Sequence, residues 1–266
     1  MSINDEPRAI LGVMDSLLNR RKEYEAFHAR RRRLPKALLL SGALFFLMDV
    51  LLGFSSHLFI VVAAALWIAA FVMFFTLRRA RPGSDFAPHY QTARDIVYTL
   101  RDDVHPRRTL FGHLDLTGWG QESKIARRAS NALGRSVVHY RDEWLSLKTK
   151  LYDGNMLRMS AIERVKQHAG YFKRGRISGK QKWKPPVMKG DRQELKVRVS
   201  VNPDVYTILP DSPTRAGARI GAYAIDHLDT SGGIITLSAS SPASKISPDD
   251  ILGVLRATYA LLQRKV

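Results

Sequence analysis

The segment with the clearest chemical character is a run of cations and aromatic rings between residues 164 and 198. It holds twelve Lys and Arg residues against two acids, a net charge of +10, and it includes Tyr171, Phe172 and Trp183. Cations mixed with aromatic rings suit the phosphate headgroups of anionic lipids, and they equally suit the backbone and stacked bases of a nucleic acid. A solvated loop with no dedicated partner is the third alternative.

The residues expected to contact an anionic surface lie in two runs. One run is a loop between two strands, where glycines and the Pro185–Pro186 pair predict flexibility. The other run is a group of four arginines in the N-terminal segment, whose alternative role is to set membrane topology as a solvated charge run. Together the predicted contact residues are Lys173, Arg174, Arg176, Lys180, Lys182, Trp183, Lys184, Arg30, Arg31, Arg32 and Arg33.

Patterns for catalysis or metal binding are weak. The chain has no cysteine, which excludes disulfides, thiolate zinc sites, iron–sulfur clusters and cysteine nucleophiles. No two of the eight histidines are three or four residues apart, the spacing that would place two metal ligands on one helix face. His113 and Asp115 have the spacing of one strand face, so a small enzyme is a further alternative, as is a site at His227 beside Asp226 and Asp229. We expect no cofactor and no metal.

Two apolar runs, Ala37 to Phe54 and Leu58 to Leu77, are separated by a short polar break at residues 55–57. They are 18 and 20 residues long, enough for each to cross a bilayer as a helix, and the break predicts a tight antiparallel hairpin. The small residues Gly42, Ala63 and Ala70 would let the two helices approach closely. The one acid in these runs is Asp49, an intramembrane polar residue for a proton relay or an interhelix contact, or one that reaches water near the outer surface beside His57.

The charges that flank these runs predict their orientation. Eight Lys and Arg residues lie between positions 20 and 36, three follow at positions 78–81, and the break between the runs has none. The positive-inside rule then places the protein in the inner membrane of the cell with both termini in the cytoplasm. The absence of cysteine agrees with a reducing compartment.

Helical spacing of apolar residues marks two further helices. Ile10, Val13, Met14 and Leu17 predict an amphipathic helix in the N-terminal segment. A narrow seam formed by Tyr90, Ala93, Val97 and Leu100 predicts another over residues 85–103, beside the membrane. The glycine-rich stretch from 110 to 135 is expected to be mostly loop, with a short helix at about residues 123–132.

From about residue 136 the apolar period changes to two, the period of half-buried strands. Residues 145–152 and 195–201 alternate in this way, and Asp153-Gly154 indicates a hairpin turn. Ser247, Pro248 and Asp250 predict the start of a C-terminal helix that runs through Leu262 to basic residues at its end. Half-polar strands favour an antiparallel sheet with one wet face. This layout resembles, in outline, the bacterial membrane-tethered pleckstrin-homology-like proteins, and no function is transferred on that basis.

The expected fold is therefore a membrane-anchored α+β protein. A two-helix transmembrane hairpin is followed by an antiparallel β-rich cytosolic domain, a sheet or small barrel, capped by a C-terminal helix. The expected divisions are residues 1–34 (amphipathic helix and basic run), 35–78 (transmembrane hairpin), 79–134 (linker and juxtamembrane helix) and 135–266 (β domain).

The function expected from these features is that of a non-enzymatic interaction or scaffold protein facing the cytoplasm. With 42 Lys and Arg against 24 Asp and Glu, the chain has a net charge of +18, which suits an anionic partner. The expected partners are the lipid bilayer and its anionic headgroups, a protein partner or a second copy of the chain, or nucleic acid. Tethering the β domain to the membrane would raise its effective concentration there, so that a weak intrinsic affinity for a partner at the membrane would be enough for binding.

Overall fold

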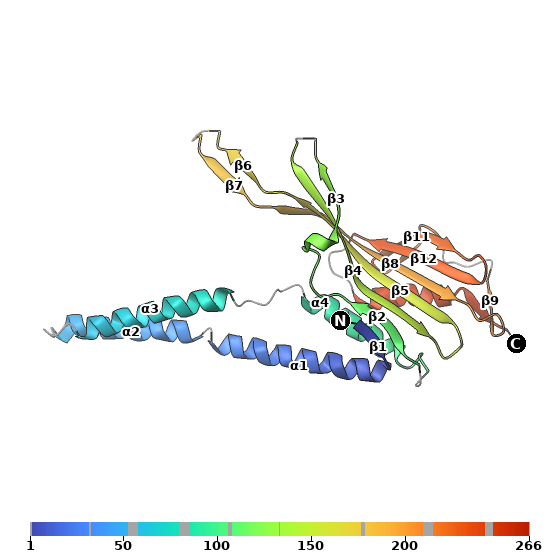
Figure 1. The fold of residues 1–266 in the computed structure, drawn as a ribbon, viewed down its shortest axis with the longest axis horizontal. Helices are drawn as coiled ribbons and strands as arrows, with labels where there is room; N and C mark the ends of the chain where they lie inside the picture. The colour runs from blue at the N-terminus through green and yellow to red at the C-terminus, as the bar shows by residue number, and fades with distance from the viewer. Residues whose placement is uncertain are drawn as a thin grey trace. The chain divides into compact units, whose positions relative to one another are not determined.

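The computed structural model describes residues 2–31, 33–52, 58–79, 86–105, 108–132, 134–176, 179–209, 215–242 and 247–265. The chain divides into two units, one of residues 1–12 with 85–266 and the other of residues 13–84. Together they contain a mixed α+β fold with an antiparallel sheet, a C-terminal helix and two long apolar helices (Figure 1). Each unit is described by itself below.

The unit of residues 13–84 is helical. It contains most of α1 (Pro7–Arg31), followed by α2 (Arg33–Leu52) and α3 (Leu58–Arg79). The stretches 29–51 and 59–76 are long and apolar enough to cross a membrane. Their apolar side chains, among them Leu40, Val61 and Ile68, are mostly exposed, unlike those of a helix in a soluble core. The two predicted helices are therefore confirmed as helices with apolar surfaces.

The contact between α2 and α3 includes the small residues that the sequence predicts, together with aromatic rings such as Phe45 and Phe59. Ala63 and Ala70 are buried. At Gly42 an added Cβ would lie 2.6 Å from the indole nitrogen of Trp67, so only glycine leaves room for that ring. The same indole N–H donates to the Leu39 carbonyl at 3.3 Å, which fixes the ring across the two helices.

In the described part of the chain, nine strands form one antiparallel sheet. Its order is β1 (Ser2–Asp5), β2 (Leu110–Leu114), β4 (Ser136–Lys150), β5 (Met156–His168), β8 (Val187–Ser200), β12 (Ile234–Ser241), β11 (Tyr223–Asp229) and β10 (Arg219–Ile220), while β3 (Ile125–Ser130) pairs with the first half of β4. The order runs from one edge strand to another, so the sheet is open and is not a barrel.

One face of this sheet carries the core. The cross-strand rows Leu145–Ala161–Leu195–Ala239 and Leu147–Met159–Val197–Leu237 are buried along their whole length. The helices α4 (Phe86–Leu100) and α5 (Pro248–Tyr259) contact each other, and both have buried apolar stripes. The predicted seam of Tyr90, Ala93, Val97 and Leu100 is the buried stripe of α4. This helix thus belongs to the core of the β unit.

The prediction for residues 110–135, a loop with a short helix at about 123–132, is wrong. The stretch contains β2, the 3₁₀ turn Glu122–Lys124 and β3. Leu110 and Leu114 are buried on β2, and a Cβ on Gly112 would overlap the Ser146 carbonyl oxygen of β4. The glycine that suggested a loop is therefore the residue that lets two strands pair closely.

The predicted C-terminal helix is shorter than expected. It ends at Tyr259, and Leu262 lies in β13 (Leu262–Arg264), which pairs with β9 (Tyr206–Ile208). The predicted cap also differs, because the Ser247 side chain makes no capping hydrogen bond among the described residues. Asp250 instead accepts a hydrogen bond at 3.3 Å from the backbone N–H of Ala222 and so joins the helix to the sheet.

Candidate functional site

The basic segment predicted to be a flexible loop contains a two-stranded hairpin. Its strands are β6 (Tyr171–Arg174) and β7 (Gln181–Lys184), and they continue from the ends of β5 and β8. Figure 1 shows this hairpin extending beyond the sheet at the same end as β3. The predicted contact residues Lys173, Arg174, Arg176, Lys180, Lys182, Trp183 and Lys184 are all exposed on it.

The hairpin has two chemically different faces, because residues paired across two strands point to the same side. On one face Phe172 pairs with Trp183, and their ring centroids are 4.9 Å apart. The two side chains are 65% and 53% exposed, although large aromatic side chains are usually buried. A Cβ on Gly170 would overlap the Trp183 ring, so this glycine leaves room for the indole at the base of the hairpin.

The other face of the hairpin is cationic. The pairs Tyr171–Lys184 and Lys173–Lys182 lie on it. The guanidinium carbon of Arg135, from the turn after β3, lies 3.7 Å from the centre of the Tyr171 ring. This cation–π contact joins the β6–β7 hairpin to the turn between β3 and β4.

No acid offsets the positive charge of this hairpin. Residues 169–190 contain seven Lys and Arg residues and no Asp or Glu. Loss of hydration and the charges of Lys189, Lys166 and Arg135 lower the pKa of His168 at its base. The apolar side chains of Val187 and Met188 are also exposed there. The hairpin is thus an exposed, positively charged surface with an apolar part.

The second predicted run is in the helical unit. Arg30, Arg31 and Arg33 are exposed at the junction of α1 and α2, and Arg32 lies outside the described residues. The Arg31 guanidinium lies 4.2 Å from the centre of the Phe27 ring.

The sequence leaves three roles open for Asp49, and His57 lies outside the described residues. The Asp49 side chain is buried, and its Oδ1 has no hydrogen-bond partner among the described residues. The role of this carboxyl group stays a prediction.

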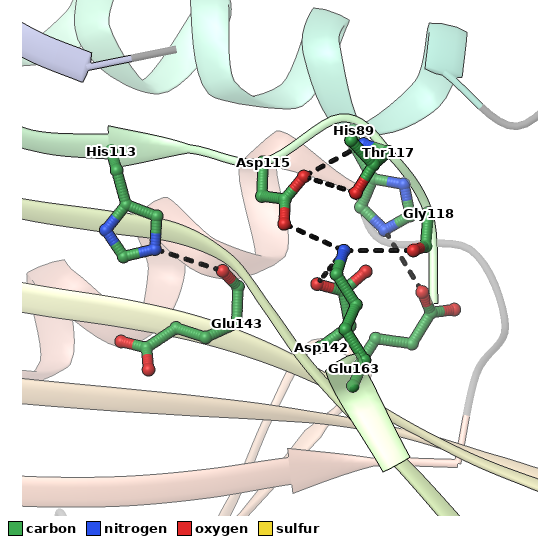
Figure 2. Close-up of polar contacts among 9 residues, drawn as sticks. His89, His113, Asp115, Thr117, Gly118, Asp142, Glu143 and Glu163 are labelled. Carbon is green, nitrogen blue, oxygen red and sulfur yellow. Dashed lines mark hydrogen bonds and ion pairs between the residues drawn. The ribbon is translucent and has the colours of Figure 1, made fainter. Parts of the chain in front are cut away.

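A buried polar cluster lies on the core face of the sheet, and the sequence analysis missed it. Asp142, Glu163, Gln193 and Ser241 form one cross-strand row, and each is at least nine-tenths buried. Figure 2 shows the carboxylates of this row beside His89 of α4 and Asp115, which follows β2.

Lys124, at the end of the 3₁₀ turn, neutralises the first part of this cluster. Its Nζ lies 2.7 Å from Asp142 Oδ1 and 2.8 Å from Asp115 Oδ2, and it donates to the Gly118 carbonyl at 2.9 Å. Asp115 also accepts hydrogen bonds from the backbone N–H and hydroxyl of Thr117, at 2.9 and 2.7 Å. Two carboxylates and one backbone carbonyl thus surround the ammonium.

The two carboxyl groups respond differently to this environment. Partial burial opposes ionisation of Asp115, but the hydrogen bonds from Lys124 and Thr117 outweigh it and lower the pKa of Asp115 to about 2. Asp142 is more deeply buried, and burial raises its pKa against the opposing effect of Lys124. The charge on Asp142 therefore depends on Lys124.

Glu163 and Gln193 form the second part of the cluster. Gln193 Nε2 donates to Glu163 Oε1 at 3.2 Å, and His89 Nε2 lies 3.8 Å from Glu163 Oε2. The His89 ring also lies edge-on to buried Trp144, with 4.6 Å between centroids. Burial raises the pKa of neighbouring Asp191, against the opposing charge of His89. These contacts join α4 to the sheet.

The residues of the two alternative sites have other contacts. His113 Nε2 lies 3.3 Å from the Glu143 carbonyl oxygen, and Asp115 contacts Lys124 (Figure 2). Asp226 pairs with Arg192 at 3.3 Å. Over the described residues, no group of three or more His, Asp or Glu side chains is arranged to hold a metal ion. Within the cluster, Asp115 and Asp142 pair with Lys124, and Glu163 accepts a hydrogen bond from Gln193.

Comparison with protein families, curated proteins and solved structures finds no match for this chain.

Proposed function

We propose that this chain is a membrane-anchored interaction protein that holds its basic β unit at the cytoplasmic face of the inner membrane. In this proposal α2 and α3 cross the bilayer, and both termini lie in the cytoplasm. The β6–β7 hairpin and the Arg30–Arg33 run contact anionic lipid headgroups. The protein acts by tethering and positioning, without catalysis.

The helical unit supports the anchoring part of the proposal. The exposed side chains of α2 and α3 are apolar over two stretches long enough to span the hydrocarbon core. An apolar surface of this extent is energetically unfavourable in water. Lys and Arg flank the stretches on the sides that lead to the β unit and are absent from the short connection between them. This asymmetry favours a cytoplasmic β unit.

The observation that carries the lipid-contact part is the exposed Phe172–Trp183 pair on a hairpin rich in cations and free of acids. Aromatic rings favour the headgroup level of a bilayer, and each nearby Lys or Arg adds about 1 kcal/mol of attraction to an anionic leaflet. A hairpin that combines both can insert its rings while its cations contact phosphates. The chain of the β unit continues into the helical unit at residue 13 and returns from it at residue 84. This covalent connection to an anchor in the membrane gives the β unit a high local concentration near the leaflet.

The test uses the full chain reconstituted in nanodiscs of phosphatidylcholine, with or without phosphatidylglycerol. Quenching of tryptophan fluorescence by brominated lipid should increase in the anionic discs, and Trp183→Phe should abolish the increase. Lys173→Gln/Lys182→Gln/Lys184→Gln should reduce it, because the attraction depends on charge. The charge-matched control is Lys150→Gln/Arg264→Gln/Lys265→Gln, which changes exposed cations away from the hairpin. Equal quenching in neutral and anionic discs would contradict the lipid contact.

A nucleic acid is the second candidate partner, because exposed rings beside cations also stack on bases. The same nanodiscs can be titrated with single- and double-stranded DNA and RNA. Saturable binding that falls steeply with salt, and that is lost in both Trp183→Ala and the hairpin triple variant, would favour this function.

A further inference from the structure

The outer face of the sheet, opposite the core, carries two rows of cations. Within each row, the cations of β4, β5 and β8 are cross-strand partners. The first row, named here the paired row, is Arg141–Arg164–Arg192. The second, named the unpaired row, is Lys148–Arg158–Arg198. Both rows lie on one face, because the residues of β5 and β8 that belong to them are separated by even numbers with no irregularity between them.

Every cation of the paired row has a carboxylate partner. Arg164 Nε lies 2.8 Å from Glu194, and Arg192 lies 3.3 Å from Asp226. Arg141 lies 3.8 Å from Glu143. Carboxylates therefore offset the repulsion between like charges in this row.

The unpaired row has no such partners. Lys148, Arg158 and Arg198 are exposed, and none makes an ion pair with a described residue, nor does Lys196, two residues before Arg198 on β8. Like charges placed directly opposite each other in a sheet are destabilising. Four neighbouring cations thus have no ion-pair partner among the described residues. The paired row shows that carboxylates can be accommodated on the same face of the sheet.

These cations border a hollow in the sheet of about 410 Å³, within the range of small-ligand sites. Its lining includes Ser146, Ser160 and Thr236, whose hydroxyl groups can donate to anionic oxygens, and one acid, Glu143, which lies 3.8 Å from Arg141. Phe111 of β2 lies opposite Lys148 at the end of the row, and its ring is exposed. The hollow therefore offers cations and hydroxyl donors, and Phe111 places an exposed ring beside Lys148.

We propose that this hollow binds a small soluble ligand carrying at least two phosphate groups, and that a nucleoside polyphosphate is the form that also uses Phe111. Neighbouring strands lie about 4.8 Å apart, so the three cations of the row span about 10 Å and can contact different phosphates. Arginine binds phosphate oxygens in a bidentate manner, which suits Arg158 and Arg198. This site is separate from the β6–β7 hairpin, and the proposal does not depend on lipid contact by that hairpin.

The experiment is isothermal titration of the full chain in phosphatidylcholine nanodiscs with pyrophosphate and with ADP. Arg158→Gln/Arg198→Gln removes two unpaired cations, and Arg164→Gln/Arg192→Gln removes two paired cations from the same strands as a matched control. We expect the first variant to weaken binding by at least about tenfold, because the loss of one hydrogen bond to a charged group lowers affinity by about that factor. The control variant should change the affinity by less than about twofold. Phe111→Ala should weaken ADP binding and leave pyrophosphate binding unchanged. The hairpin variant Lys173→Gln/Lys182→Gln/Lys184→Gln should bind both ligands as the unmodified chain does.

Retained tryptophan fluorescence and thermal midpoint will show that each variant is folded. If Arg158→Gln/Arg198→Gln fails to fold, Lys148→Gln/Lys196→Gln replaces it with the same expectation. Repetition in nanodiscs containing phosphatidic acid distinguishes the ligand source, since a soluble ligand should still bind there. Absence of saturable binding, equal weakening by the unpaired-row and paired-row variants, or loss of pyrophosphate and ADP binding in the phosphatidic acid discs would overturn the proposal.

Discussion

Replacing Lys124 by methionine tests whether the buried cluster depends on one cation. The Lys124 side chain is 11% exposed, and that of Asp142, 2.7 Å away, is 3% exposed. Methionine has a similar length but no charge, so the variant leaves the Asp142 carboxylate buried without a counter-ion. Removing one partner of a buried ion pair typically costs about 3–5 kcal/mol. For a unit of this size each kcal/mol corresponds to about 2–4 °C, so the unfolding midpoint should fall by about 10 °C.

The loss should depend on pH in a defined direction. Burial already raises the pKa of Asp142, and loss of Lys124 should raise it further. A carboxyl group whose pKa is higher in the folded protein than in the unfolded chain destabilises the fold as pH rises above the unfolded value. The difference between Lys124→Met and the unmodified chain should therefore be small near pH 4 and grow toward pH 7.

The assay is thermal unfolding of the full chain in neutral detergent, followed by tryptophan fluorescence, with Trp144 buried beside the cluster. The double variant Lys124→Met/Asp142→Asn should recover much of the loss, because it removes the unpaired charge. Lys150→Met, at an exposed position of β4, is the control and should change the midpoint little. A loss below about 1 kcal/mol, or one that is independent of pH, would refute the inference that Lys124 compensates a buried charge.

Three further outcomes are expected. The pKa of Asp115 is lowered from 3.8 to about 2, which corresponds to about 1 kcal/mol of stability after discounting for the exposure of its side chain. This stability is present above pH 3.8 and is lost as the pH falls toward 2. Asp115→Asn should remove this acid-dependent decrease of the unfolding midpoint. Gly112→Ala should lower the midpoint by several degrees, because its methyl group would overlap a backbone carbonyl of β4, whereas Gly120→Ala, which meets no atom, should not. Gly42→Leu should displace the indole of Trp67 from its contact with α2, measured as a shift of the tryptophan emission maximum; an unchanged spectrum would contradict the close contact.

The features that could be predicted from the sequence depend on local patterns. Two apolar runs of sufficient length specify two long apolar helices, and the alternation around Leu145 to Leu151 and Leu195 to Val201 specifies half-buried strands. The exposed cations of residues 173–184 also followed from composition, although the segment was expected to be a flexible loop. Cross-strand hydrogen bonds between β6 and β7 order it, and such pairing is not visible in a single segment.

The buried cluster was hidden by one extra residue in β4. The pairing with β5 shifts between Glu143 and Leu145, so Trp144 is an inserted residue and Asp142 lies on the same face as Leu145. Simple alternation from Leu145 would have placed Asp142 on the outer face and Glu143 in the core. A bulge reverses the two faces of a strand, and only the pairing partner reveals it.

The sequence by itself therefore determined the apolar helices, the period of the long strands and the positions of the basic residues, because each depends on neighbours in the chain. Only the tertiary structure decided that residues 2–5 form a sheet edge, that Lys124 meets Asp142, and that Lys148, Arg158 and Arg198 form one row without carboxylates. These arrangements depend on the register between strands far apart in the chain. Register is set by the packing of the whole core face, and no single segment contains that information.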